Sequence, residues 1–122
     1  NLIPDITLKE GITSDTFNEN ITSWDVSNVT NMTNTFSGAR LFNQDISSWD
    51  VRNVESMKSM FHGALDFNQD IISWDVSKVI NMGDMFHFAY AFNQPIGNWN
   101  VSSVLWMDNM FNDAKSSLVI GM

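Results

Sequence analysis

The chain has 122 residues and no cysteine, which excludes disulfides, thiolate zinc sites and cysteine nucleophiles. Its 14 acidic and six basic residues give a net charge of −8, whereas nucleic acids and anionic membrane surfaces are bound through basic patches. No segment approaches the roughly 20 consecutive apolar residues that a membrane-spanning helix needs. We therefore expect no nucleic-acid partner and no direct membrane insertion.

A 25-residue repeat runs through the chain four times. The same residue types return at this spacing, as in Trp24, Trp49, Trp74 and Trp99. A period of 20 to 50 residues is typical of chains whose structural units stack on one another. We expect a cap or degenerate half-turn at 1–16, four repeats at 17–41, 42–66, 67–91 and 92–116, and a tail or truncated turn at 117–122.

Each repeat divides into two patterns, seen most clearly in the second. Residues 46–51 end in alternation, so that Trp49 and Val51 face inward while Ser48 and Asp50 face outward, as on a short strand. Apolar residues in 54–64 follow a spacing of three to four, as on one stripe of a short helix. The repeat predicts an α/β, leucine-rich-repeat-like right-handed solenoid with one short parallel strand and one short helix per turn.

The ends of the expected helices carry suitable residues. Ser27, Ser77 and Ser102 stand just before them and are expected to cap their free N–H groups. Gly38 and Gly63 lie near their carboxyl ends, where a left-handed residue is often needed.

The repeat resembles the BspA-like leucine-rich repeats known from mycoplasma surface proteins, the DUF285 family. Residues 42–64 read FNQDISSWDVRNVESMKSMFHGA against the family pattern FNxDIsxWDvsNVtnMxxMFxxA. Three units match this pattern strongly, and the fourth departs from it at Pro95 and Asn100. The resemblance implies a secreted, lipid-anchored or wall-attached protein used in adhesion, with no catalytic residues. Since the chain begins at Asn1 without a signal peptide, we expect it to be a piece of a longer protein.

The outward positions of the expected strands form a polar strip. It consists of Ser23, Asp25, Ser48, Asp50, Ser73, Asp75, Asn98 and Asn100. We expect this strip to contact a ligand, either a glycan or a protein. Carboxylates stacked about 5 Å apart also suit calcium, although the residues favour simple bonds from Asp25, Asp50 and Asp75 to nearby backbone. We expect no other cofactor and no dedicated metal site.

An asparagine follows the phenylalanine that opens every repeat. These residues are Asn18, Asn43, Asn68 and Asn93. Ligand contact is one interpretation. We favour a structural ladder instead, in which each side chain bonds backbone groups of the neighbouring turn.

Two variable columns become apolar toward the carboxyl-terminal half. These columns contribute Ile80, Leu105 and Trp106, and Phe88 and Tyr90 also depart from their equivalents in the preceding copy. The predicted partner patch comprises these five residues. Exposed apolar patches mark interfaces, so the patch predicts a partner, a neighbouring domain or self-association. Coverage by the chain's own tail is an equal alternative.

No sequence motif indicates catalysis. His62 and His87 align one repeat apart, but neither has an evident acidic partner or nucleophile. We therefore expect a non-enzymatic extracellular or cell-surface module that binds a protein or glycan in adhesion. The alternative is a structural or self-assembly spacer of a larger surface protein.

Overall fold

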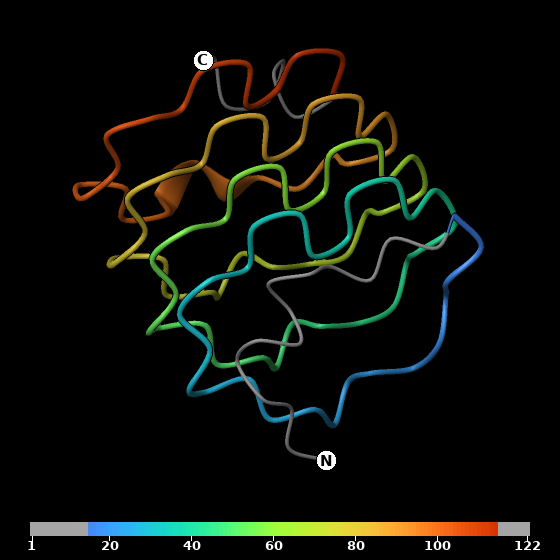
Figure 1. The fold of residues 1–122 in the computed structure, drawn as a ribbon, viewed down its shortest axis with the longest axis horizontal. Coiled ribbons are helices and arrows are strands. Elements are labelled where there is room, and N and C mark those ends of the chain that lie inside the picture. Colours follow the sequence, from blue (N-terminus) through green and yellow to red (C-terminus); the bar gives the residue numbers. More distant parts are fainter. Residues whose placement is uncertain (1–14, 115–122) are drawn as a thin grey trace.

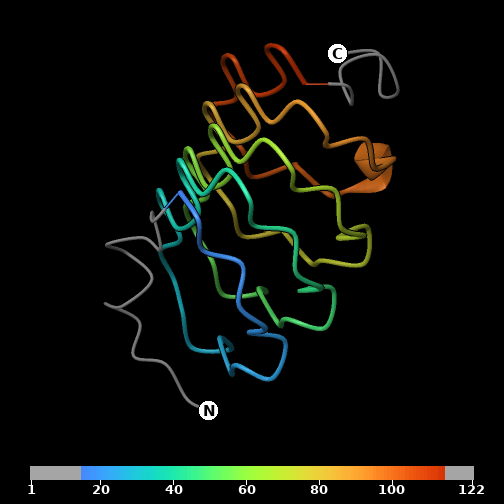
Figure 2. The same ribbon diagram turned by 90° about the vertical axis from the view of Figure 1, so that its right-hand side faces the viewer.

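The computed structural model describes residues 15–114. The chain forms a series of loops laid on one another from the amino-terminal to the carboxyl-terminal end (Figures 1 and 2). Within the described part, the one helical element is a 3-10 turn, η1, at Ile96–Asn98. Isolated parallel bridges join Asn31 to Ser56, Ser56 to Asn81, and Asn81 to Trp106.

The predicted α/β leucine-rich-repeat-like solenoid, with a strand and a helix in every turn, is therefore wrong. Residues 15–114 contain no α-helix and no strand longer than a single bridge. Likewise, none of these residues belongs to a helix long and apolar enough to cross a membrane.

Tight turns replace the expected helix. In the first copy, the N–H groups of Thr35, Ser37 and Ala39 each donate to the carbonyl three residues earlier, at 3.0–3.2 Å. Asn34 and Gly38 have φ of 62° and 78°, which no helix interior accommodates. The apolar spacing of three to four comes from this succession of turns, because each turn returns one side chain to the interior.

The remaining N–H groups of the same segment leave the turn altogether. Those of Met32, Asn34, Phe36 and Gly38 donate to carbonyls of the next copy at 2.8–3.0 Å. A helix over this segment would use most of these groups internally, through bonds to the fourth residue back. Stacking therefore competes with helix formation for the same donors, and here stacking prevails.

The expected strand is also interrupted by turns. The N–H of Trp49 donates to Ile46 O at 3.1 Å, and that of Val54 donates to Val51 O at 3.0 Å. The alternation itself is real, because Trp49 and Val51 are buried while Ser48 and Asp50 are exposed. Side-chain direction was thus predicted correctly although the strand was not.

Stacked columns of identical apolar residues form the core. The second copy contributes the fully buried set Phe42, Ile46, Trp49, Val51, Val54, Met57, Met60, Phe61 and Ala64. Phenylalanine rings pack between neighbouring copies, because Phe61 lies 4.1 Å from Phe67 and 5.5 Å from Phe86 of the next copy, measured between ring centroids. Burying each large side chain stabilises the fold by about 1.5–3 kcal/mol.

Polar side chains link the copies at fixed positions. The indole N–H groups of Trp49, Trp74 and Trp99 donate to the carbonyls of Ile21, Ile46 and Ile71 at 3.1–3.2 Å. The amide oxygens of Asn18, Asn43 and Asn68 accept the backbone N–H of the next asparagine in the column at 2.8–2.9 Å. The predicted asparagine ladder is therefore confirmed.

The predicted ends cannot be compared with the structure. All but two residues of the expected cap at 1–16, and the whole expected tail at 117–122, lie outside the described residues. The repeat boundaries stay predictions, while the bonds between neighbouring copies recur every 25 residues.

Replacing Trp74 by alanine is expected to destabilise the protein by about 3–5 kcal/mol. The substitution empties a column in the middle of the core and removes the indole bond to Ile46 O. Urea unfolding measures the change, and the exposed neighbour Ser73→Ala serves as a control with less than about 0.5 kcal/mol. A loss below about 1 kcal/mol for Trp74→Ala would contradict a continuous core.

Gly63→Ala is expected to destabilise by about 1–2 kcal/mol for a conformational reason alone. Gly63 has φ of 71°, yet a Cβ there would lie 3.8 Å from the nearest atom, so no clash contributes. Gly97→Ala is the control, because Gly97 is exposed and lacks a positive φ. Equal thermal melting of the two variants would refute this explanation.

Candidate functional site

The predicted acidic column is exposed, but each member serves its own turn. The Oδ1 atoms of Asp25 and Asp75 each accept the N–H and the hydroxyl of the serine two residues later, at 3.0 and 2.6 Å. Asp50 accepts the N–H of Arg52 at 3.2 Å, and Asn100 that of Ser102 at 3.1 Å. The prediction that Ser27, Ser77 and Ser102 cap helices is wrong, because they close these turns instead.

These bonds also set the acidity of two carboxyls. The hydroxyl and then the N–H of Ser27 hold the pKa of Asp25 below its ordinary value. Ser77 acts in the same way on the pKa of Asp75. Within residues 15–114, no three acidic or histidine side chains are grouped closely enough to hold a metal ion.

The other half of the predicted strip is also at the surface. Its members Ser23, Ser48, Ser73 and Asn98 are all exposed. Asn98 lies in η1, which only the last copy contains. The strip stays a predicted ligand surface.

The predicted partner patch divides into two groups. Ile80, Leu105 and Trp106 are 37%, 72% and 54% exposed and lie on adjacent copies, where the N–H groups of Leu105 and Trp106 both approach Ile80 O. Phe88 and Tyr90 form the second group, with ring centroids 6.0 Å apart.

The first group borders two hollows. Ile80 and Leu105 line one of them with Glu55, Lys78, Ser102 and Ser103. The other, which we name the Trp106 hollow, has a volume of about 330 Å³ and is lined by Lys58, Asn81, Gly83, Asp84, Trp106 and Asp108. An exposed indole beside a lysine, two carboxylates and an amide can pack on an apolar face of a ligand and bond its polar groups.

Gly83 helps to form the Trp106 hollow. Its equivalents in the other copies are Thr33, Lys58 and Asp108, so a side chain is compatible with this backbone position. A Cβ on Gly83 would lie 3.3 Å from Asn81 Oδ1 and 3.5 Å from Asp108 Oδ1. The glycine therefore leaves open the space between these two polar groups.

Phe88 adopts a backbone conformation that suits glycine. Its φ of 61° occupies the place of Gly38 and Gly63 in the preceding copies, so the bulky residue is strained. Its ring stacks 4.1 Å from that of His87 and remains 37% exposed. Strain retained at an exposed aromatic residue is a sign of function, which makes this group a secondary candidate.

Sequence reasoning missed several neighbours of these aromatic residues. His87 does have an acidic partner, because its Nδ1 lies 3.4 Å from Asp84 Oδ1. Its ring also stacks 5.0 Å from that of His62. Asp84 precedes His87 by three residues, and the tight turn between them brings the two side chains together. The hollow could have been suspected in the sequence from Gly83, because the other copies carry a larger side chain at this position.

The comparisons with known proteins identify the family. The model of the family described as "Mycoplasma protein of unknown function, DUF285" matches residues 8–119. The chain belongs to this family. No curated protein and no solved structure matches it.

Ser77→Ala is expected to raise the pKa of Asp75 toward its ordinary value, because the hydroxyl bond to Oδ1 is lost. A depressed carboxyl pKa stabilises the fold above about pH 4, and this contribution disappears as the pH falls through the folded-state pKa. The variant should therefore lose stability at neutral pH and approach the parent in acid. Carbon-13 carboxyl titration and pH-dependent unfolding measure both effects, with Ser73→Ala as control.

Proposed function

We propose that the chain is a non-enzymatic module that binds a protein or a glycan of a cell surface through the Trp106 hollow. The observation that carries this proposal is the exposed indole of Trp106 beside the polar groups of Lys58, Asp84 and Asp108. An aromatic residue that is half exposed in a surface depression has the properties of a binding hot spot.

The repeat explains how such a site arises without loss of stability. The corresponding column reads Asn31, Ser56, Asn81 and Trp106, and its backbone takes part in the parallel bridges whatever the side chain. The column is therefore free to vary, while the buried columns maintain the stack. Binding specificity in this architecture belongs to such variable surface positions.

The proposed location follows from the resemblance to BspA-like surface repeats. It implies a secreted, lipid-anchored or wall-attached parent protein that acts in adhesion. The acidic charge of −8 fits neutral or basic partners better than anionic ones. The absence of a known catalytic motif supports binding rather than turnover.

The first experiment measures binding of the purified chain to intact cells, matrix glycoproteins and an array of glycans. Trp106→Ala and Gly83→Thr are expected to weaken binding at least tenfold, because one removes the anchor and the other fills the hollow. Gly83→Thr introduces the residue that the first copy already carries at Thr33. Trp106→Ala should melt like the parent, since Trp106 is exposed, whereas Gly83 is buried, so the melting of Gly83→Thr is measured beside its binding.

Two further variants separate the alternatives. Leu105→Asp should abolish binding to a protein that covers both hollows, while a glycan seated on Trp106 alone should tolerate it. A triple Asp25/Asp50/Asp75→Asn variant examines the acidic strip, with and without EDTA. Binding that survives Trp106→Ala and Gly83→Thr but is lost in the triple variant would transfer the site to the strip and refute the Trp106 proposal.

A further inference from the structure

The Trp106 hollow carries a net negative charge. Its lining includes two carboxylates, those of Asp84 and Asp108, and one ammonium group, that of Lys58. One positive and two negative charges leave the hollow at −1, within a chain whose net charge is −8. The hollow and the chain as a whole therefore attract cations and repel anions.

Oxygen atoms surround the space above Gly83. A Cβ atom on this residue would lie 3.3 Å from Asn81 Oδ1, 3.5 Å from Asp108 Oδ1 and 3.9 Å from Asp108 O. Two of these oxygens are held by backbone bonds, because Asn81 Oδ1 accepts the N–H of Gly83 and Asp108 O accepts that of Asp84, both at 2.9 Å. Since a carbonyl oxygen and a carboxylate accept more than one bond, this side of the hollow suits a hydrogen-bond donor.

The equivalent space is closed at the first junction between copies. There Thr33 stands at the position of Gly83 and Ser56 at the position of Trp106, and their hydroxyl groups bond each other at 2.8 Å. At the third junction, glycine and tryptophan replace both partners of this bond. The hollow therefore exists because the chain departs from the closed arrangement at both positions.

The exposed indole of Trp106 suits a planar cation. Tryptophan attracts cations more strongly than the other aromatic residues do. A guanidinium group is flat, so it can stack on an indole while its N–H groups donate to carboxylates at its edge. The compact ammonium group of a lysine cannot make both kinds of contact equally well.

Asp108 is the carboxylate that a ligand can reach more easily. The side chain of Asp84 is 28% exposed, and its Oδ1 lies 3.4 Å from His87 Nδ1. Asp108 is exposed at the mouth of the hollow. Removal of the Asp108 charge is therefore the more direct test of the electrostatics of the hollow.

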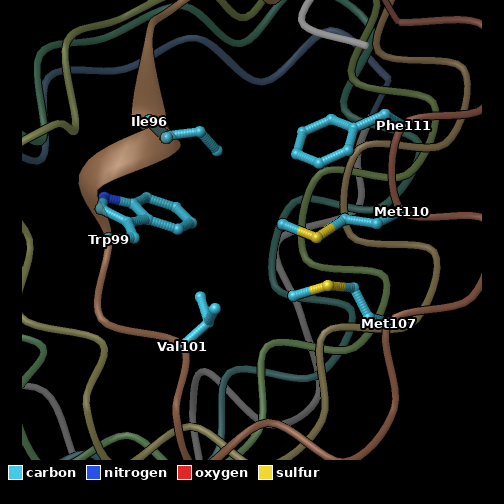
Figure 3. Close-up of a pocket in the computed structure, with 7 residues that line it drawn as sticks. Ile96, Trp99, Val101, Met107, Met110 and Phe111 are labelled. Carbon is cyan, nitrogen blue, oxygen red and sulfur yellow. The ribbon is translucent and has the colours of Figure 1, made fainter. Parts of the chain in front are cut away.

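A second cavity in the last copy offers different chemistry. It opens between Ile96, Trp99 and Val101 on one side and Met107, Met110 and Phe111 on the other (Figure 3). Its volume is about 50 Å³, and none of these lining side chains carries a charge. A charged group would lose its hydration there without a compensating partner. A cationic ligand thus fits the Trp106 hollow and not this cavity.

We infer that the Trp106 hollow binds an arginine side chain of a basic segment of a partner protein. This inference rests on the proposed function, because it names the ligand of the site proposed there. The guanidinium group lies against the indole of Trp106 and donates to the Asp108 carboxylate and to Asn81 Oδ1. The ammonium group of Lys58 opposes the ligand's charge, so its removal should strengthen binding.

The test is a titration of the full chain with a capped glycine–arginine–glycine peptide, followed by the nitrogen-15 indole signal of Trp106. The spectrum of Trp106→Phe identifies that signal. The matched probe carries citrulline in place of arginine, which keeps the shape and removes the charge. The arginine peptide should shift the signal saturably and bind about tenfold more tightly than the citrulline peptide, with a smaller difference at high salt. Equal affinities of the two peptides would overturn the inference.

Variants should change the affinity in opposite directions. Asp108→Asn keeps the shape and removes a negative charge, so it should weaken binding of the arginine peptide about tenfold. Lys58→Gln removes the opposing charge and should strengthen binding about threefold, a gain that damage to the fold does not produce. Asp66→Asn is the matched control, because Asp66 is exposed and lies outside the hollow. Equal affinities of Asp108→Asn and Asp66→Asn would contradict the inference.

A neutral oligosaccharide of N-acetylhexosamine units separates this inference from the proposed function. A shift of the Trp106 signal by the oligosaccharide and not by the arginine peptide would overturn the inference and leave the hollow as a binding site. No shift with either probe, together with cell binding that survives Trp106→Ala, would overturn both. Saturable binding of the arginine peptide with the expected effects of Asp108→Asn and Lys58→Gln would establish the cationic ligand.

Discussion

The division of backbone N–H groups between a copy and its neighbour is the constraint on which this structure depends. In the turn segment, alternate N–H groups bond within the copy and to the next copy, as Thr35 and Phe36 illustrate. This arrangement requires a reversal at Asn34 and another at Gly38, both with positive φ. Asparagine, aspartate, serine and glycine fill most of these positions, because such residues tolerate the left-handed conformation at the lowest cost.

The polar surface follows from the same constraint. Since tight turns leave many backbone groups without helix or sheet partners, side chains must bond them. Asp25, Asp50 and Asp75 close turns, and Asn18, Asn43 and Asn68 connect copies. These exposed columns look like a ligand-binding array, but their side chains already make the hydrogen bonds that close the turns and connect the copies. The proposed ligand recognition therefore rests on the positions that the backbone does not constrain.

Much of the architecture could be predicted from the sequence, and the failure to predict the rest has a physical cause. The period, the inward direction of Trp49 and Val51 and the asparagine ladder follow from spacing and residue chemistry. The prediction of a helix was wrong because successive three-residue turns produce nearly the same apolar spacing as a helix. The Trp106 hollow was not predictable as a whole, because Lys58, Gly83 and Asp108 occupy one column on three different copies. Their meeting depends on the stack rather than on any local pattern.

The sides and the interior of the stack carry different chemistry, and this separates the proposed binding role from the stability of the fold. On the sides, substitutions such as Asn81 to Trp106 within one column alter a surface without touching the backbone bonds. In the interior, the buried columns and the backbone bonds between copies hold the stack together. Ligand choice at the proposed Trp106 hollow can therefore change while the fold is kept, because the varying side chains take no part in those bonds.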